Sequence, residues 1–272
     1  MTDVRGDVMR SVTVRCIVGL AFASVLIGPA LGQETQLPDF SGLWQRAENA
    51  SGRTYQQPAE GPGPIEDFPD AGAFRIGDYT NPILQPHAAN AVREHGERGR
   101  SGEVIMPAWS LCWPSGVPLV INMGEPVQIL QDPEYVVILY RRDMQVRRIK
   151  LNDAVPESVR PSWYGYSVGH YEGGNTLVVE TVGQNDRAEV DRFGTPRSEN
   201  IRVVERYSIN PDRTEIRVEF TVEDPDTFTT PWSGSATYYK AEEPFVERIC
   251  AENNKDPDGG IYPIPVDATP DF

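Results

Sequence analysis

Apolar and polar residues alternate along much of the second half of the chain. In residues 215–222 every second residue is apolar, and the residues between them are charged or polar. A period of two is typical of a β-strand with one face in a core and the other in water. The pattern therefore predicts strands in this half of the chain.

Turn-forming residues separate the alternating runs. Asp132-Pro133-Glu134 and Asn210-Pro211-Asp212-Arg213 are examples. Strands joined by short turns predict a mainly β fold, an antiparallel meander that forms a barrel or a barrel-like sheet. The absence of crossover helices disfavours a parallel α/β fold. The predicted strands are residues 128–130, 135–140, 146–151, a hairpin within 163–181, 201–209, 216–222, 235–240 and 245–250.

The hairpin carries the best candidate for chemistry. Val168, His170 and Glu172 alternate and share one strand face, and residues 173–175 (Gly-Gly-Asn) supply a turn that requires positive φ. His170 is the single His of the β-rich region, and a neighbouring carboxylate can fix its tautomer for proton transfer near neutral pH. His170 and Glu172 are therefore the candidate catalytic pair. The alternative is a His and a Glu on a solvated strand end.

Residues 45–118 have a different composition, rich in Gly, Pro and charge, and indicate an irregular arm. One helix is predicted within residues 82–98, with Pro86 in its first turn. His87 and His95 lie near its ends and are expected on the solvated surface. The expected organisation is a signal peptide at 1–32, a first strand plus the arm at 33–118, the barrel at 119–252 and an extended tail at 253–272.

The first residues predict export. Arg10 and Arg15 precede an apolar run over residues 17–27, and Ala30 and Gly32 provide small residues for cleavage before Gln33. The run is too short for a transmembrane anchor, so no membrane anchor is expected after cleavage. The expected location is periplasmic or extracellular. The formal net charge of −15 disfavours nucleic-acid partners and anionic membranes.

Two cysteines, Cys112 and Cys250, remain after the predicted leader that contains Cys16. An even pair in an oxidising compartment predicts a disulfide. A two-thiol metal site is the alternative, but no His lies near either Cys in sequence, so no metal is expected. No phosphate-binding glycine loop or dinucleotide fingerprint is present, and no cofactor is expected.

Alternation also places two charges on apolar strand faces. Glu205 shares a face with Val203 and Tyr207, and Arg147 shares a face with Ile149. A lone buried charge is strongly unfavourable, so Arg147 and Glu205 are predicted to pair in the interior. Alternatively, a bulge would turn both charges to water.

Two resemblances carry further expectations. Gly169-His170-Tyr171-Glu172-Gly173 and the following Thr176-Leu177 resemble a motif of a family of exported bacterial β-proteins of uncharacterised activity, whose usual form is Gly-His-Trp-Glu-Gly-Asp-Thr-Leu. Here Tyr171 replaces the Trp and Gly174-Asn175 replace the Asp, which puts a role for that Asp in doubt. Gly42-Leu43-Trp44 also resembles the Gly-x-Trp of lipocalin-like barrels, which implies an interior ligand site and a Trp44 that packs across a closed end. The first resemblance rests on residues 38–44, 169–173, 176–181, 204–207, 224–225 and 231–232.

These observations leave three functions open. The first is binding of a small, mostly apolar ligand inside the barrel, and the second is a cofactor-independent acid–base enzyme, a lyase, isomerase or hydrolase, that acts on such a ligand. A structural or partner-binding role is the third, and the oligomeric state is not predicted. The residues expected to line or rim the ligand site are Arg147, Glu205, Tyr171, Tyr207, Trp163, Trp232 and Tyr239.

Overall fold

The computed structural model describes residues 37–47, 55–71, 76–242 and 244–250. The predicted leader and the predicted tail from residue 253 lie outside the described residues. Within the described ranges, no helix has both the length and the apolar character needed to cross a membrane.

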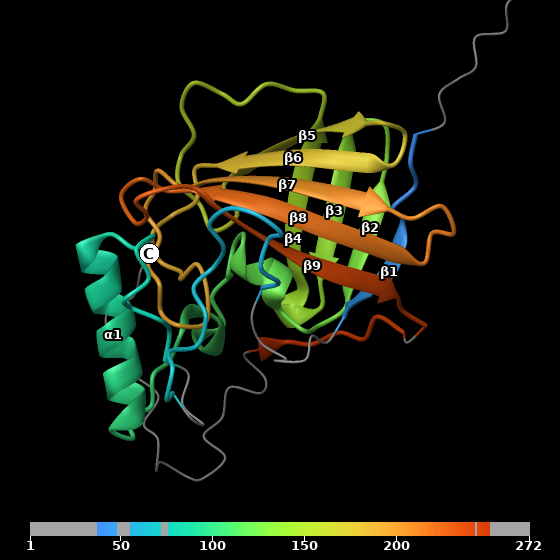
Figure 1. Ribbon diagram of the computed structural model, residues 1–272. Coiled ribbons are helices and arrows are strands. Elements are labelled where there is room, and N and C mark those ends of the chain that lie inside the picture. Colours follow the sequence, from blue (N-terminus) through green and yellow to red (C-terminus); the bar gives the residue numbers. More distant parts are fainter. Residues whose placement is uncertain (1–36, 48–54, 72–75, 243, 251–272) are drawn as a thin grey trace, which may run out of the picture. The chain divides into compact units, whose positions relative to one another are not determined.

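Nine strands of the described chain close into a barrel, which confirms the predicted mainly β fold (Figure 1). Strands that follow one another in sequence are neighbours in the sheet, and β1 pairs with both β2 and β9 to close the ring. The strands are β1 Gly42–Arg46, β2 Val127–Gln131, β3 Tyr135–Tyr140, β4 Gln145–Leu151, β5 Tyr166–Glu172, β6 Thr176–Val182, β7 Arg202–Ile209, β8 Glu215–Glu223 and β9 Trp232–Lys240.

One strand pair departs from the predicted antiparallel meander. β4 and β5 run parallel, with Ile149 opposite Ser167 and Leu151 opposite Gly169. The reason is the long connection over residues 152–165, which carries the chain back along the barrel before β5 begins. The register joins only the last three residues of β4 to β5, whereas every residue of β4 except Leu151 pairs with β3. The first half of β4 therefore has no β5 partner, and the barrel wall is incomplete there.

The predicted last strand, residues 245–250, is wrong. The described residues after β9 form no strand. The physical reason is that β1 already pairs with the edge of β9 that a further strand would need. Most of these residues are exposed, and Arg248 and Cys250 contact the segments before β2 and between β3 and β4 instead.

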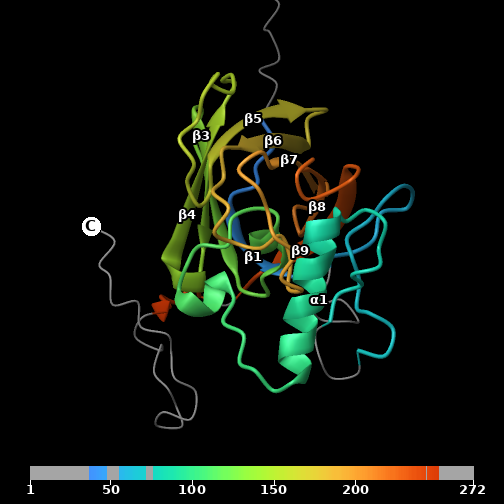
Figure 2. The same ribbon diagram turned by 90° about the vertical axis from the view of Figure 1, so that its left-hand side faces the viewer.

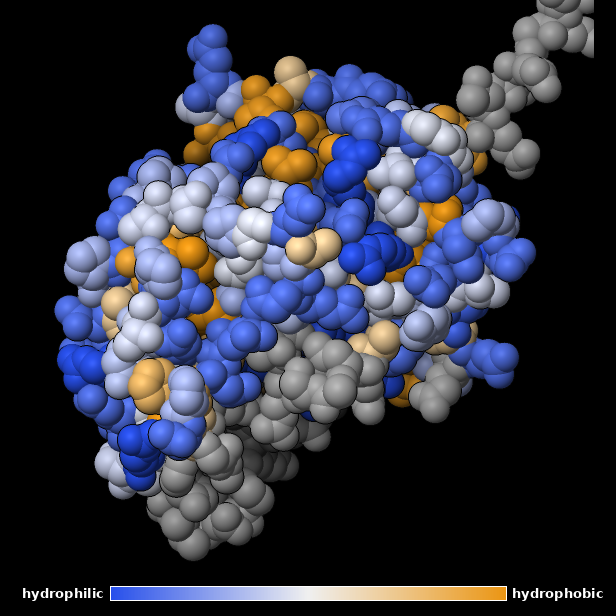
Figure 3. All heavy atoms as spheres, in the orientation of Figure 1, coloured by the Kyte–Doolittle hydropathy of each residue, from blue (hydrophilic) through white to orange (hydrophobic). Residues whose placement is uncertain are grey.

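Inward residues fill the barrel. On β7 and β8 the buried positions alternate as the sequence predicts, with Val203, Val218 and Val222 fully enclosed. The outward positions of these two strands are mostly polar, and hydrophilic residues cover most of the face seen in Figure 3. Trp44 is fully buried, and its indole N–H donates to the Phe40 carbonyl at 2.8 Å. Trp44 is therefore a packed core residue.

One end of the barrel is covered by the helix α1 (Pro86–Arg100) and by coil (Figures 1 and 2). Ala88 and Val92 of α1 belong to the same core cluster as the barrel residues. The predicted helix is confirmed, and it begins at Pro86 because Gln85 before it is extended. Three short 3-10 helices accompany it, η1 (Ala108–Leu111), η2 (Leu119–Asn122) and η3 (Arg142–Met144).

The two histidines of α1 differ in their exposure to solvent. His87 is exposed as expected. His95 is half-buried because its ring packs against Gly194, where a side chain would collide with it. Burial, with the nearby Arg98, lowers the pKa of His95.

Candidate functional site

A buried ion pair lies inside the barrel. Arg147 of β4 and Glu205 of β7 face inward, and their side chains are 1% and 0% exposed. Arg147 Nη1 donates to Glu205 Oε1 at 2.9 Å, and Nη2 donates to the second carboxylate oxygen. The predicted inward pair is confirmed, and neither strand is turned by a bulge.

Neighbouring strands complete the network around this pair. Arg147 Nη2 donates to Thr181 Oγ1 at 2.7 Å, and Nε donates to Ser167 Oγ at 3.2 Å. The Tyr207 hydroxyl donates to Glu205 Oε1 at 2.7 Å. We call Arg147, Ser167, Thr181, Glu205 and Tyr207 the buried network. It exists because β4, β5, β6 and β7 each present a polar residue at an inward position of the same layer.

The network keeps its charges. Burial by itself lowers the pKa of Arg147, but the attraction and hydrogen bonds of Glu205 hold that pKa well above its usual value. Burial raises the pKa of the adjacent Tyr140 to about 12. Because these polar groups already satisfy one another, a ligand would have to displace an existing bond to contact them. This geometry makes the pair a structural tie between strands.

An open groove lies where β4 and β5 diverge. Its volume is about 390 Å³. We call it the seam groove, and it exists because the parallel register leaves the first half of β4 without a β5 partner. The residues that line it are Tyr135, Val146, Arg147, Arg148, Lys150, Tyr164, Gly165, Tyr166 and Ser167.

Cations and aromatic rings form the walls of the seam groove. The Arg148 guanidinium lies 4.6 Å from the centre of the Tyr135 ring. Within the described residues Arg148 makes no ion pair, whereas Lys150 pairs with Asp153 at 2.7 Å. The Tyr166 hydroxyl also donates to Asp153, at 3.1 Å. Arg148 is therefore a cation of this groove that forms no ion pair within the described residues.

Tyr164 and Gly165 form the side of the groove opposite β4. The Tyr164 ring stacks on Tyr140 with centroids 5.9 Å apart, and its hydroxyl donates to Gln145. Gly165 has a φ of +61°, and a Cβ there would lie 2.1 Å from the Val182 carbonyl oxygen. A side chain is therefore excluded at position 165.

The predicted catalytic pair lies elsewhere, on the outer wall. His170 Nε2 and Glu172 Oε1 are 2.9 Å apart, and Glu172 also accepts a hydrogen bond from Arg206 at 2.8 Å. The pair forms as predicted, but the His170 side chain is 54% exposed. Ser167, Gly169 and Tyr171 take the inward positions of β5, so alternation turns His170 away from the interior. Arg206 first, and then His170, lower the pKa of Glu172.

The predicted aromatic residues do not gather around one cavity. Tyr207 belongs to the buried network, and Trp232 packs among Tyr55, Phe220 and Phe228. Tyr239 is 50% exposed because Tyr238 takes the inward position, so Tyr239 does not line the interior.

The other two predicted aromatic residues lie apart from these. Tyr171 lies near the end of β5, where its ring stacks on Phe40 with centroids 6.4 Å apart and its hydroxyl accepts a hydrogen bond from Gln131. Trp163 precedes β5 and tilts against Trp113 at 5.5 Å.

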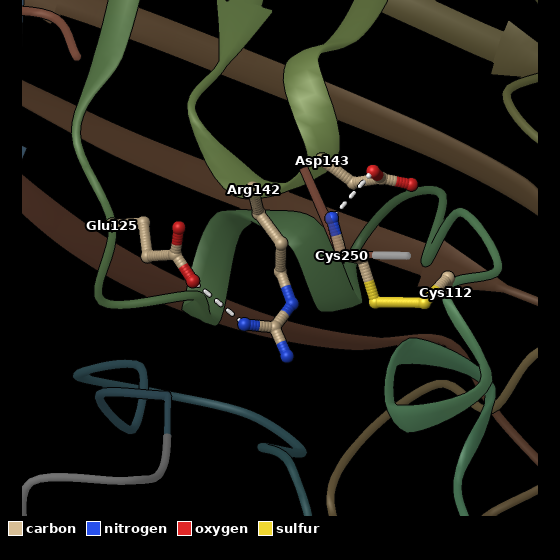
Figure 4. Close-up of a disulfide and its surroundings, with 5 residues drawn as sticks. All are labelled: Cys112, Glu125, Arg142, Asp143 and Cys250. Carbon is tan, nitrogen blue, oxygen red and sulfur yellow. Dashed lines mark hydrogen bonds and ion pairs between the residues drawn. A yellow bond between two sulfur atoms is a disulfide. The ribbon is translucent and has the colours of Figure 1, made fainter. Parts of the chain in front are cut away.

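Cys112 and Cys250 form the predicted disulfide, across a sequence separation of 138 (Figure 4). A hollow of about 210 Å³ lies beside it, and we call it the disulfide hollow. Its lining residues are Trp109, Ser110, Cys112, Arg142, Asp143, Gln145, Arg248 and Cys250.

Comparison with known proteins adds no family, because no protein-family model and no curated protein matches the chain. In the described ranges, no group of three or more His, Cys, Asp or Glu side chains is placed to hold a metal ion. The candidate site therefore rests on the geometry of the seam groove.

Sequence reasoning missed the seam groove. Its outward residues, Val146, Arg148 and Lys150, alternate with the inward residues of the predicted strand 146–151 and were visible as its outer face. The parallel pairing that opens the wall beside them is set by the path of residues 152–165, which carries no periodic signal. The usable signal was the length of that connection, which exceeds a hairpin turn.

Proposed function

We propose that the protein binds a small molecule in the seam groove, and that this ligand combines a flat, mostly apolar body with a negatively charged group. The observation that carries this proposal is the Arg148 guanidinium stacked on Tyr135 at the groove, without an ion pair in the described chain. The chain has a net charge of −15, so an arginine that lies beside aromatic rings, with no paired carboxylate among the described residues, is unusual in it. The proposed ligand site is therefore the seam groove in the barrel wall, and not the barrel interior expected from the sequence.

The groove matches this ligand in size and chemistry. Ligand pockets for small molecules begin at about 300 Å³ and are lined mostly by apolar and aromatic groups with a few polar groups. A guanidinium can bind a carboxylate through two parallel hydrogen bonds. Tyr135, Tyr164 and Tyr166 offer ring surface for a flat body of one or two rings.

The enzyme alternative has less support. The lining of the seam groove includes no His and no carboxylate. Its Lys150 is paired with Asp153, and the His170–Glu172 pair lies on the outer wall. Binding without chemistry is therefore the function that this geometry supports best.

Binding of 2-naphthoate and of its neutral analogue 2-naphthamide, measured by isothermal titration calorimetry, tests the proposal. The groove is open to solvent, so 2-naphthoate is expected to bind with a Kd of roughly 10 µM to 1 mM. The amide should bind about fivefold more weakly, the scale of one exposed charge pair.

Arg148→Gln should abolish the preference for the anion. The matched control is Arg217→Gln, which removes an exposed arginine of β8 that pairs with Glu219 and lies outside the groove. Equal affinity for the two probes, or equal loss in both variants, would refute the proposal.

We also propose that the protein works in the periplasm or outside the cell. The disulfide supports an oxidising compartment, since disulfides are rare in cytosolic proteins. Cell fractionation followed by immunoblotting of the native protein tests this, and recovery with a cytosolic marker would contradict it.

A further inference from the structure

The disulfide borders open space. Cys112 and Cys250 are both half-buried, and both line the disulfide hollow. A disulfide exchanges only when a thiolate can approach one of its sulfur atoms. The hollow provides room beside the two cysteines for a small thiol.

Two arginines and one carboxylate line this space, Arg142, Arg248 and Asp143. Arg142 Nη1 and Arg248 Nη1 donate to the same oxygen of Glu125, at 2.6 and 2.7 Å, and Glu125 lies outside the lining (Figure 4 shows Arg142 and Glu125). Each guanidinium has further N–H groups that can donate to an anion. The two positive charges against one negative charge in the lining favour an anionic ligand.

We propose that the disulfide hollow is a thiol–disulfide exchange site for small thiols that carry a carboxylate. The carboxylate of the thiol pairs with Arg142 and Arg248, which are the arginines that line the hollow. Its thiolate then attacks the Cys250 sulfur. This inference is independent of the ligand proposed for the seam groove.

The exchange step balances without a further reactant. A sulfur–sulfur bond forms between the small thiol and Cys250, and the Cys112–Cys250 bond breaks. The electron pair of the broken bond stays on Cys112 as a thiolate, which takes a proton from water. Cys112 is the leaving group because Asp143, which accepts the Cys250 N–H at 3.0 Å, would repel a thiolate at Cys250.

The exchange would release the segment after β9 from its covalent bond to Cys112. Most of the described residues of this segment are exposed, and its noncovalent contacts include the Arg248–Glu125 ion pair, the Cys250–Asp143 hydrogen bond and the hydrogen bond from Ala241 N–H to the Leu43 carbonyl at 2.9 Å. The barrel strands and the core cluster include no described residue of this segment. Opening the disulfide would therefore loosen the segment while the strand pairing of the barrel is kept.

The test compares three thiols of similar size on the native protein. The probes are 3-mercaptopropionate, neutral 2-mercaptoethanol and cationic cysteamine, and acid-quenched intact mass spectrometry gives the rate of disulfide opening per unit of thiolate. Each rate is divided by the rate of the same thiolate with the small neutral 2-hydroxyethyl disulfide, because thiolates of different pKa differ in nucleophilicity. We expect 3-mercaptopropionate to react about fivefold faster than 2-mercaptoethanol, the scale of one partly exposed ion pair, and cysteamine to react slowest. Peptide mapping should place the first adduct on Cys250.

Two variants locate the effect. Arg142→Gln and Arg248→Gln should each reduce the advantage of the carboxylate, whereas Arg217→Gln on β8 should leave it unchanged. Rates that are equal among the three thiols, a first adduct on Cys112, or a native protein that forms no adduct would each overturn the proposal. The comparison of thiols on the unmodified chain stands even if a variant fails to fold.

Discussion

Arg147 and Glu205 place two opposite charges inside an otherwise apolar barrel. Burying a charge is favourable only when a partner and further hydrogen bonds compensate for the lost water, and Ser167, Thr181 and Tyr207 supply those bonds. The pair therefore fixes the relative positions of the strands that carry it. Because the hydrogen-bonding groups of Arg147 and Glu205 are already occupied, we place the ligand in the seam groove beside the pair.

Removal of Glu205 should show how much the stability of the fold depends on the ion pair. Glu205→Ala leaves Arg147 buried without a counter-charge and should lower the free energy of unfolding by about 3–5 kcal/mol. Glu219→Ala, at an exposed position of β8, should change it by less than about 0.5 kcal/mol. Urea denaturation measures both, and similar small effects in the two variants would show that the pair does not stabilise the fold.

The buried Asp191 carboxyl should make the stability of the fold depend on pH. It accepts hydrogen bonds from Phe193 N–H and the Thr195 hydroxyl, at 2.8 and 2.7 Å, yet burial raises its pKa to about 6 from the ordinary 3.8. Between about pH 4 and pH 6 the folded chain therefore holds a proton that the unfolded chain has released. Stability from this group is present at low pH and is lost as the pH rises through about 6.

Asp191→Asn should remove this pH dependence. Relative to the variant, the native protein should lose up to roughly 3 kcal/mol of unfolding free energy between pH 4 and pH 7. The comparison cancels the contributions of the other carboxyl groups. A difference between the two proteins that is constant from pH 4 to pH 7 would mean that the pKa of Asp191 is not raised.

The orientation of strand β5 decides whether His170 faces the barrel interior or water. Alternation on this strand sends Ser167 inward and His170 outward, so the candidate catalytic pair faces water beside Arg206. Spacing alone placed the two residues on one face but could not say which face. The pairing of β5 with β4 and β6 decides that question.

His170→Ala should therefore have little effect. We expect a change in unfolding free energy within about 0.5 kcal/mol, as for other exposed substitutions, and unchanged affinity for 2-naphthoate. Thermal denaturation and calorimetry measure the two quantities. Loss of binding in this variant would restore the outer pair as the functional site.

Strands with a strict period of two were predictable because each has one buried and one solvated face. Residues 135–140 are matched to the residue by β3, and residues 201–209 differ from β7 by only one residue. The failure at residues 245–250 has another cause, since an apolar run cannot show whether a neighbouring strand has a free edge. The parallel direction of β5 was equally hidden, because it depends on the path of an irregular connection.

At the scale of the whole molecule, ring closure and the disulfide act on different parts of the chain. β1 comes from the start of the described chain and closes the barrel between β2 and β9, so contacts distant in sequence complete the fold. The disulfide closes a loop over a separation of 138 residues, which in the entropic account restricts the unfolded chain by roughly 5 kcal/mol. Neither feature fills the gap beside β4, and the seam groove remains open.

The central claim is that this gap is a binding site. Titration of the ¹⁵N-labelled protein with 2-naphthoate, followed by amide chemical shifts, tests it most directly. We predict that the largest shift changes occur at Arg148, Gly165 and Tyr166, on the two sides of the groove, and that Arg148→Gln weakens them. Shift changes that instead gather around Tyr171 at the barrel end or His170 on the outer wall, or no changes at millimolar ligand, would contradict the account.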